Sequence, residues 1–294
     1  MPNNTTARRR REPGLAIKHL KGDYSLARSY WLHTVLLGWG TSWLGIYAIQ
    51  KVGEHHAARH ASMTLLVYLC VALLITAWSL AGAWMSAMKS LFGRGGRFWA
   101  ILAMLSLAFG AVGTMREYIE LRPALREHWA IARGEQPAED FEVVLLEEGR
   151  VVSYTGGVNE GASRVLDQVI ADAPRVTTVR LESPGGWMRE GERMAAVIRR
   201  YGLSTRVDTE CHSACTVAFL AGIDRTLGEG AVLGFHRGRA PGQNAKGESE
   251  AHDAEVYAKA GLPQAFIRRV LETPHDDIWT PSRRELLKAG VLTR

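Results

Sequence analysis

The segment CHSACTVAFLAG occupies residues 211–222 of a chain of 294 residues. A strand is expected before it, at residues 204–207, and its small apolar residues predict a helix after Ser213. Ser213 therefore lies at a strand-to-helix turn, where unpaired backbone N–H groups and the positive end of the helix dipole face it. A serine in this position is a nucleophile if a base and an oxyanion site are close. The alternative is a simple helix N-cap.

Two cysteines bracket this serine, at positions 211 and 215, and the third, Cys70, lies in an apolar run. Two cysteines four residues apart are too few for a zinc site without further ligands at suitable spacing. We therefore expect no metal and no cofactor. A disulfide between Cys211 and Cys215 is an open alternative in an oxidising compartment, although its geometry is demanding.

Positive charge is concentrated near the N-terminus of the chain, whose formal net charge is +6. Much of the excess lies in Arg8, Arg9, Arg10, Arg11, Lys18, Lys21 and Arg28. A basic tail beside membrane spans is usually a topology signal, and no nucleic-acid-binding motif accompanies it. Residues 1–28 are predicted to be a basic cytoplasmic tail. No signal peptide is expected, because the first apolar run starts late and lacks a small-residue cleavage site.

Three apolar runs follow the tail, at residues 29–50, 61–88 and 98–115. Each is long enough to cross a bilayer, so residues 29–116 are predicted to form three transmembrane helices. A buried bundle of a soluble protein is the alternative, and short polar loops between three such runs disfavour it. Three spans after a cytoplasmic tail place the C-terminal half across the membrane. The predicted location is a bacterial inner membrane, multi-pass, with the C-terminal domain in the periplasm.

The second half of the chain begins with a predicted stalk and linker at residues 117–140, which contain Pro137. Short strands and helices then alternate. Strands are expected at residues 141–146, 150–154, 176–181, 204–207 and 230–235, and helices at 161–171, 187–201, 251–260 and 263–271. This alternation predicts an α/β domain with a largely parallel sheet over residues 141–294.

Three polar features follow successive strands of that predicted sheet. The turn Ser-Pro-Gly-Gly at residues 183–186 follows one strand, Ser213 follows the next, and His236 follows the one after. The C-terminal ends of parallel strands share one edge of a sheet. An anion-binding turn, a nucleophile and a base are therefore expected together. A third group should orient the imidazole, and Asp276 or Asp277 is available.

The ordered motifs from Leu181 to His236 are similar to those of a known family. They are Leu181-Glu182-Ser183-Pro184-Gly185-Gly186, then Ser213 followed by Ala221-Gly222, then Arg225, then Gly234-Phe235-His236. They resemble the Clp protease proteolytic subunit and its membrane-anchored relatives in the crotonase-like superfamily. The resemblance covers residues 141–294, about half of the chain. It implies a crotonase-like, Clp subunit-like α/β domain preceded by the three predicted transmembrane helices.

The same resemblance implies roles for individual residues. Ser213 is the expected nucleophile and His236 the general base. Oxyanion stabilisation is expected from the backbone N–H groups of Gly185 or Gly186 and of Ala214. In Clp subunits an Asp precedes an aromatic residue and a final helix that ends in Gly. Asp277 fits that pattern with about one inserted residue, since Trp279 and a predicted helix at 282–290 follow it, so it is preferred to Asp276.

This chain departs from the Clp pattern around the serine, where it has Cys211, His212 and Cys215. That version resembles a group of uncharacterised, predicted periplasmic proteins of the same fold. Transmembrane helices are not part of the Clp subunit, and no docking segment for an unfoldase is evident here. Self-association into a homo-oligomer is an expectation from the resemblance.

The sequence therefore predicts a membrane-anchored serine peptidase with a Ser-His-Asp triad, acting on a peptide or protein substrate and not on nucleic acid. Three alternatives remain. Lys259 replaces the histidine as base in a Ser-Lys dyad, as in signal peptide peptidases of this superfamily. The same oxyanion site serves thioester chemistry, as in crotonases. The domain is a non-catalytic, peptide-binding membrane scaffold, in which His236 is a hydrogen-bonded core residue.

Overall fold

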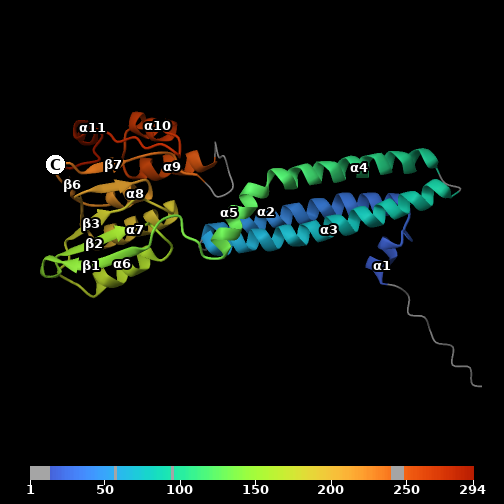
Figure 1. Cartoon of the computed structure of the whole chain (residues 1–294), viewed down its shortest axis with the longest axis horizontal. Helices are drawn as coiled ribbons and strands as arrows, with labels where there is room; N and C mark the ends of the chain where they lie inside the picture. Colours follow the sequence, from blue (N-terminus) through green and yellow to red (C-terminus); the bar gives the residue numbers. More distant parts are fainter. Residues whose placement is uncertain (1–13, 56–57, 94–95, 240–247) are drawn as a thin grey trace, which may run out of the picture. The chain divides into compact units, whose positions relative to one another are not determined.

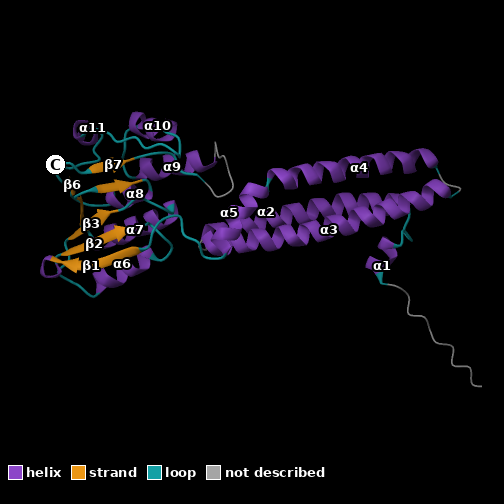
Figure 2. Cartoon of the chain, viewed as in Figure 1, coloured by secondary structure: helices purple, strands orange, loops and turns teal. Residues whose placement is uncertain are grey.

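The computed structural model describes residues 14–55, 58–93, 96–239 and 248–294. The chain divides into two compact units, Met1–Arg133 and Gly134–Arg294. We call them the helical unit and the α/β unit (Figures 1 and 2). The first residues of the predicted basic tail, 1–13, lie outside the described residues.

The helical unit contains helices and no strand in its described residues (Figure 2). Its elements are α1 (Leu15–Leu20), the π-helical η1 (Arg28–Leu36), α2 (Leu37–His55), α3 (Ala58–Phe92), α4 (Arg97–Glu120) and α5 (Arg122–Ala132). Among the described helices, α3 and α4 are long and apolar enough to cross a membrane by length and composition. The first predicted span, residues 29–50, is helical but falls outside this class. Two of the three spans expected from the sequence are thus candidate spans in the structure, and the first stays a prediction.

Small and hydroxyl-bearing residues of α3 form the surface on which η1 and α1 pack. Ser86 is buried, and its hydroxyl is 2.7 Å from the hydroxyl of Ser29 on η1. A Cβ at Gly82 would overlap the ring of His19 on α1. Close approach over small residues, with hydroxyl hydrogen bonds between helices, is typical of helix packing in membranes.

The segment expected to form a stalk packs against α3 instead. The α4 helix ends at Glu120, and α5 starts with a proline in its first turn, where the missing N–H removes no helical hydrogen bond. His128 of α5 lies 3.0 Å from the Ser62 hydroxyl of α3. The charged and apolar alternation of residues 117–133 thus marks an amphipathic helix that covers α3.

The α/β unit is built on a five-stranded sheet in the order β1-β2-β3-β4-β6. The strands are β1 (Phe141–Leu146), β2 (Val151–Gly156), β3 (Thr178–Glu182), β4 (Ser204–Val207) and β6 (Arg225–Leu227). The first pair is antiparallel and the remaining pairs are parallel. A second, two-stranded parallel sheet joins β5 (Glu210–His212) to β7 (Val232–Gly234). The expectation of a largely parallel sheet is confirmed.

Helices α6 (Ala162–Ala171), α7 (Met188–Tyr201) and α8 (Ala214–Phe219) follow strands of these sheets, and α9 (Glu248–Lys259), α10 (Gln264–Glu272) and α11 (Arg283–Lys288) complete the chain. Along β3 the side chains alternate, with Val179 and Leu181 fully buried. The apolar face predicted for residues 187–201 is confirmed, since Met194 and Ile198 of α7 are fully buried. These side chains belong to one core that also holds Phe219.

Two short strands, β5 and β6, are not predicted from the sequence. One of them, β5, is the strand that directly precedes Ser213. The strand that leads into Ser213 is β5, not the strand at residues 204–207, which pairs in the larger sheet. Strands of three residues are too short to show a period-two pattern of burial.

Arg225, one of the motif residues, fixes the C-terminal segment. Its guanidinium donates to the carbonyl oxygens of Gly222 at 3.0 Å, Gly290 at 2.8 Å and Val291 at 2.8 Å. The guanidinium ties the loop after α8 to the end of the chain through these carbonyl oxygens, and the Arg225 N–H adds a hydrogen bond to the Thr293 hydroxyl at 2.7 Å. The place of Arg225 in the motif therefore has a structural explanation.

Candidate active site

Three segments that are far apart in the sequence lie side by side at one edge of the α/β unit. Ser183 forms a parallel bridge with Cys211, and His212 pairs with Gly234 in the β5–β7 ladder. The glycine turn after Ser183, the serine after His212 and the histidine after Gly234 therefore leave their strands in the same direction. This is the arrangement that the strand order predicts.

The backbone of Ser213 has a conformation that serine rarely adopts. Its φ is +53° and its ψ is −125°, and among the described residues only Glu147 and Glu148 are other non-glycine residues with positive φ. Such a conformation costs about 1–3 kcal/mol and persists where the surroundings impose it. A strained serine between a strand and a helix is also the geometry of a nucleophile elbow.

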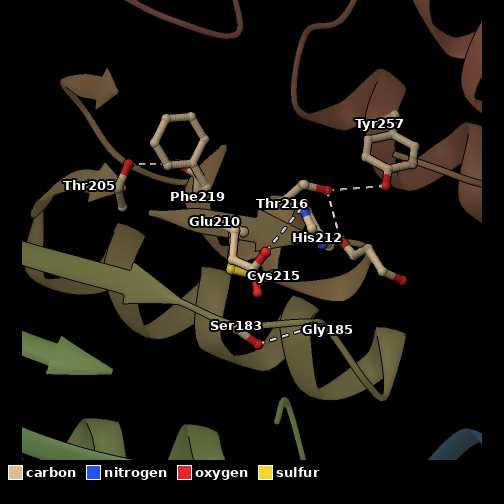
Figure 3. The surroundings of a disulfide bond; sticks show 11 residues. Ser183, Gly185, Thr205, Glu210, His212, Cys215, Thr216, Phe219 and Tyr257 are labelled. Atoms are coloured by element: carbon tan, nitrogen blue, oxygen red, sulfur yellow. Dashed lines mark hydrogen bonds and ion pairs between the residues drawn. A yellow bond between two sulfur atoms is a disulfide. The ribbon is translucent and has the colours of Figure 1, made fainter. Parts of the chain in front are cut away.

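Hydrogen bonds on both sides hold this conformation. The Ser213 N–H donates to the Gly234 carbonyl at 2.9 Å. The Ser213 carbonyl accepts from the N–H of Thr216 at 2.9 Å and from its hydroxyl at 2.7 Å. The Thr216 hydroxyl also lies 3.3 Å from the hydroxyl of Tyr257, which is fully buried (Figure 3). The sequence analysis did not identify Thr216 and Tyr257 as functional residues. The available signal was a single threonine in an otherwise apolar helix.

The Ser213 side chain is not used as a helix cap. Ser213 occupies the N-cap position of α8, yet its side chain makes no capping hydrogen bond. In the described part of the chain its hydroxyl makes no other hydrogen bond either. The N-cap alternative is therefore wrong.

The glycine turn abuts the serine directly. Gly185 has a φ of +100°, and a Cβ built on it would lie 2.7 Å from the Ser213 Cβ and 2.8 Å from the His212 carbonyl oxygen. Gly186 has a φ of +149°, and a Cβ there would overlap the Val158 carbonyl. Both positions therefore require glycine, because any side chain would displace either the serine or the neighbouring backbone.

Two backbone N–H groups, one in the glycine turn and one at the start of α8, have no partner among the described residues. Within the described residues the N–H groups of Gly186 and Ala214 form no hydrogen bond. The N–H of Gly185 donates to the Ser183 hydroxyl at 3.1 Å (Figure 3). The position of a Cβ on Gly185 is 3.4 Å from the Ala214 nitrogen, so the glycine turn and the start of α8 are in contact. Two free donors beside a serine hydroxyl are what an oxyanion requires.

His236 is a buried imidazole in its neutral form. It is 7% exposed, and its Nδ1 is buried without a partner among the described residues. Burial, together with the neighbouring imidazoles of His275 and His212, lowers the pKa of His236 to about 4, while a hydrogen bond with the Arg237 backbone and the charge of Asp276 oppose this shift. The ring of His275 is 4.9 Å away between centroids. His236 is therefore not a hydrogen-bonded core histidine through Nδ1, and it can accept a proton at neutral pH.

The expected third member of the triad, Asp277, makes no hydrogen bond to the imidazole among the described residues. Asp277 is exposed, and its carboxylate accepts from the Ile278 N–H at 2.8 Å. No hydrogen bond joins Asp277 to His236, or His236 to Ser213, in the part of the chain that the structure describes. The alternative base, Lys259, is exposed and its ammonium group pairs with Glu255 at 2.7 Å. The Lys259 ammonium group is therefore paired at the solvent-exposed surface.

The two cysteines around the serine form a disulfide (Figure 3). Their Cα atoms are 5.4 Å apart, within the range for such a bond. Both side chains are fully buried or nearly so. Cys70 is the remaining cysteine and is free and exposed. The alternative that the sequence left open is therefore decided in favour of the bond.

No family model matches the sequence, and no curated protein matches it. Among solved structures, the chain is similar to a mutant of a membrane-bound stomatin-specific protease (TM-score 0.36, 17% identity, 48% of this chain and 75% of that one). It is also similar to ClpP1 from Listeria monocytogenes (TM-score 0.40, 18% identity, 49% and 89%). A third is an enoyl-CoA hydratase from Mycobacterium avium subsp. paratuberculosis K-10 (TM-score 0.36, 16% identity, 53% and 68%). Likeness at this level concerns the fold alone and says nothing of activity.

Proposed function

We propose that the protein is a membrane-anchored serine peptidase in which Ser213 is the nucleophile. One observation carries the proposal. Ser213 is held at a φ of +53°, its hydroxyl is not used in a cap, and two unpaired N–H groups lie beside it. A structural serine has no need of this strained position, whereas a nucleophile between an oxyanion site and a base does.

The reaction follows from the placement of these groups. The Ser213 hydroxyl attacks a peptide carbonyl while His236 accepts its proton. The N–H groups of Gly186 and Ala214 donate to the oxyanion that forms, and the Gly185 turn keeps the two donors together. His236 then gives the proton to the leaving amine, which departs and leaves an acyl ester on Ser213. Water attacks this ester while His236 accepts its proton. The carboxylic acid product leaves as His236 returns the proton to Ser213 Oγ.

The third group of the triad is proposed to be Asp277, with Asp276 as the alternative. Asp276 is close enough to His236 for its charge to act on the ring, while Asp277 is the residue that the family pattern selects. Catalytic hydrogen bonds are often long in enzymes without substrate and shorten in the complex. Substrate binding is therefore proposed to bring one of these carboxylates, and the Ser213 hydroxyl, to the imidazole.

The location is proposed to be a bacterial inner membrane, with the α/β unit in the periplasm. The candidate spans α3 and α4 support membrane anchoring. The Cys211–Cys215 disulfide supports an oxidising compartment for the α/β unit, since such bonds are rare in the cytosol. Residues 29–50 are proposed as a further span, which makes the anchor multi-pass. Homo-oligomerisation is proposed from the family resemblance.

A fluorophosphonate probe tests the nucleophile directly. The full-length protein in detergent is expected to form a covalent adduct on Ser213, and Ser213→Ala is expected to abolish it. Ser204→Ala is the matched control, because Ser204 lies on β4 in the same unit and should label as the unaltered protein does. No adduct on the intact protein, or an equal adduct on Ser213→Ala, would reject the proposal.

A second candidate is a peptide-binding scaffold without catalysis. The observation in its favour is that no hydrogen bond joins Ser213 to His236 among the described residues. Under this alternative, peptides bind to the full-length protein while neither adduct nor cleavage is detected. Binding without labelling thus selects the scaffold, and labelling at Ser213 selects the peptidase.

A further inference from the structure

The Cys211–Cys215 disulfide spans the residue on which the proposed function depends. Cys211 is the middle residue of β5, Cys215 is the second residue of α8, and Ser213 lies between them. We refer to residues 211–216 as the serine turn. The bond therefore fixes the start of α8 to the strand that leads into the serine (Figure 3).

Hydrogen bonds join the strand side of the serine turn to neighbouring segments, whereas on the helix side they close the turn on itself. On the strand side, the N–H of His212 donates to Ser183 and that of Ser213 donates to Gly234. On the helix side, Thr216 bonds to the Ser213 carbonyl. The α8 helix has only six residues, and a helix that short has little stability of its own. A covalent link between the two sides is what keeps the helix start at a constant distance from the strand.

The conformation of Ser213 gives such a link a function. A serine at positive φ relaxes to an ordinary conformation unless its neighbours prevent it. Rotation of Ser213 toward negative φ would turn the first residues of α8 away from β5. Cys215 lies in that first turn, so the bond to Cys211 opposes this rotation.

We propose that the disulfide is a positioning element that keeps Ser213 in its reactive conformation, and that the nucleophile is competent only when the bond is formed. The reactivity part of this inference rests on the proposed role of Ser213. Reduction by a dithiol breaks the Sγ–Sγ bond, adds two electrons and two protons to give two thiols, and converts the dithiol to a disulfide. The serine turn then loosens while the rest of the α/β unit stays folded.

Burial of the two cysteines decides how the reduced state is prepared. Cys211 is 0% and Cys215 1% exposed, so a reductant reaches the bond only when the serine turn opens locally. A double variant, Cys211→Ala with Cys215→Ala, removes the bond without waiting for that opening. The full-length protein treated for long periods with dithiothreitol is the second route. Cys70→Ala is the matched control, because it removes the free cysteine only.

Two measurements on the full-length protein separate positioning from reactivity. The first is amide hydrogen exchange of the serine turn, with strands β2 and β3 as the internal reference. Loss of the bond is expected to raise exchange in the serine turn at least tenfold and to leave the reference strands unchanged. The second is the rate of fluorophosphonate labelling, expected to fall about tenfold or more, which corresponds to about 1.4 kcal/mol. Cys70→Ala should change neither.

The outcomes distinguish this inference from the proposed function. Unchanged exchange in the serine turn, in a cooperatively folded double variant or in the reduced protein, overturns the inference. Increased exchange with an undiminished labelling rate also overturns it. Increased exchange together with no labelling of the oxidised protein retains the positioning role and rejects Ser213 as nucleophile. If the double variant does not fold, the reduced protein decides by the same two measurements.

Discussion

Gly185→Ala perturbs the contact between the glycine turn and the serine at one atom. Two costs add at this position. The backbone has a φ of +100°, a conformation that costs a residue with a Cβ about 1–3 kcal/mol. The new Cβ would also lie 2.7 Å from the Ser213 Cβ, where carbon atoms normally approach to about 3.5–4.0 Å. Overpacking of this kind costs a further ~1–3 kcal/mol.

The expected total is about 2–6 kcal/mol in the free energy of unfolding, which lowers Tm by roughly 2–4 °C for each kcal/mol in a unit of this size. Differential scanning calorimetry of the full-length protein measures the loss. Because the new methyl group pushes on Ser213, the fluorophosphonate labelling rate should fall as well, by at least tenfold in the fraction that remains folded.

Gly230→Ala is the matched control for this substitution. Gly230 has a φ of +74°, and no atom lies within 4 Å of the position of its Cβ. It therefore carries the backbone cost of about 1–2 kcal/mol alone, and its labelling rate should not change. Equal losses of stability and equal labelling rates for the two variants would refute the contact between the turn and the serine.

Three further predictions concern groups around the site. Since burial lowers the pKa of His236 to about 4 from an unfolded value of about 6.5, the unfolded chain binds more protons between these values. The free energy of unfolding should therefore decrease by up to about 3 kcal/mol as the pH falls from 7 to 4. Denaturant titrations should find a smaller decrease in His236→Gln, and an equal decrease in that variant would contradict the low pKa of His236. The labelling rate should fall only near pH 4, whereas an inflection near 6.5 would mean an unperturbed imidazole. Thr216→Val removes the hydroxyl that bonds the Ser213 carbonyl and contacts Tyr257, so urea unfolding should show a loss of about 1–3 kcal/mol with slower labelling, and wild-type values for both would contradict the role of Thr216. Lys259→Ala should leave labelling within about twofold, because its ion pair is exposed, and a large loss would revive the Ser-Lys dyad.

Much of the α/β unit follows from local sequence signals. The apolar face of residues 187–201 and the glycine pair at 185–186 each have a direct physical cause, namely burial on one helical face and backbone space for glycine. The small apolar residues after Ser213 likewise predict that a helix begins there, which places Ser213 at a strand-to-helix turn. Local signals do not determine which strands pair with each other. The strand β5 is three residues long and pairs with β7, so the immediate approach to the serine is set by tertiary contacts.

The helical unit illustrates a different limit of sequence reasoning. The charge-free run at residues 29–50 predicts a membrane span by length. In the structure it is divided between η1 and α2, and among the described helices α3 and α4 have the length and apolar content of candidate spans. The amphipathic segment after α4 has the composition of an exposed stalk, yet it packs on α3 through contacts such as Ser62 with His128. Composition reports which face of a helix is polar and not what covers the other face.

The environment of the imidazole and of the sulfur atoms depends on tertiary structure in the same way. Asp277 was preferred on spacing before Trp279, whereas its carboxylate bonds to the adjacent Ile278 N–H. The disulfide depended on a Cα separation of 5.4 Å that residue spacing alone does not determine. The groups that shift the pKa of His236 include His212 and the adjacent pair His275 and Asp276, which lie in two separate segments of the chain.

The most direct measurement of the central claim is a crystal structure of the full-length protein carrying a phosphonate on Ser213. The account predicts the phosphonyl oxygen about 2.7–3.1 Å from the nitrogen atoms of both Gly186 and Ala214, with the His236 ring within hydrogen-bond distance of Ser213 Oγ. A phosphonyl oxygen directed into solvent, or an adduct on another residue while Ser213 stays unmodified, would contradict it.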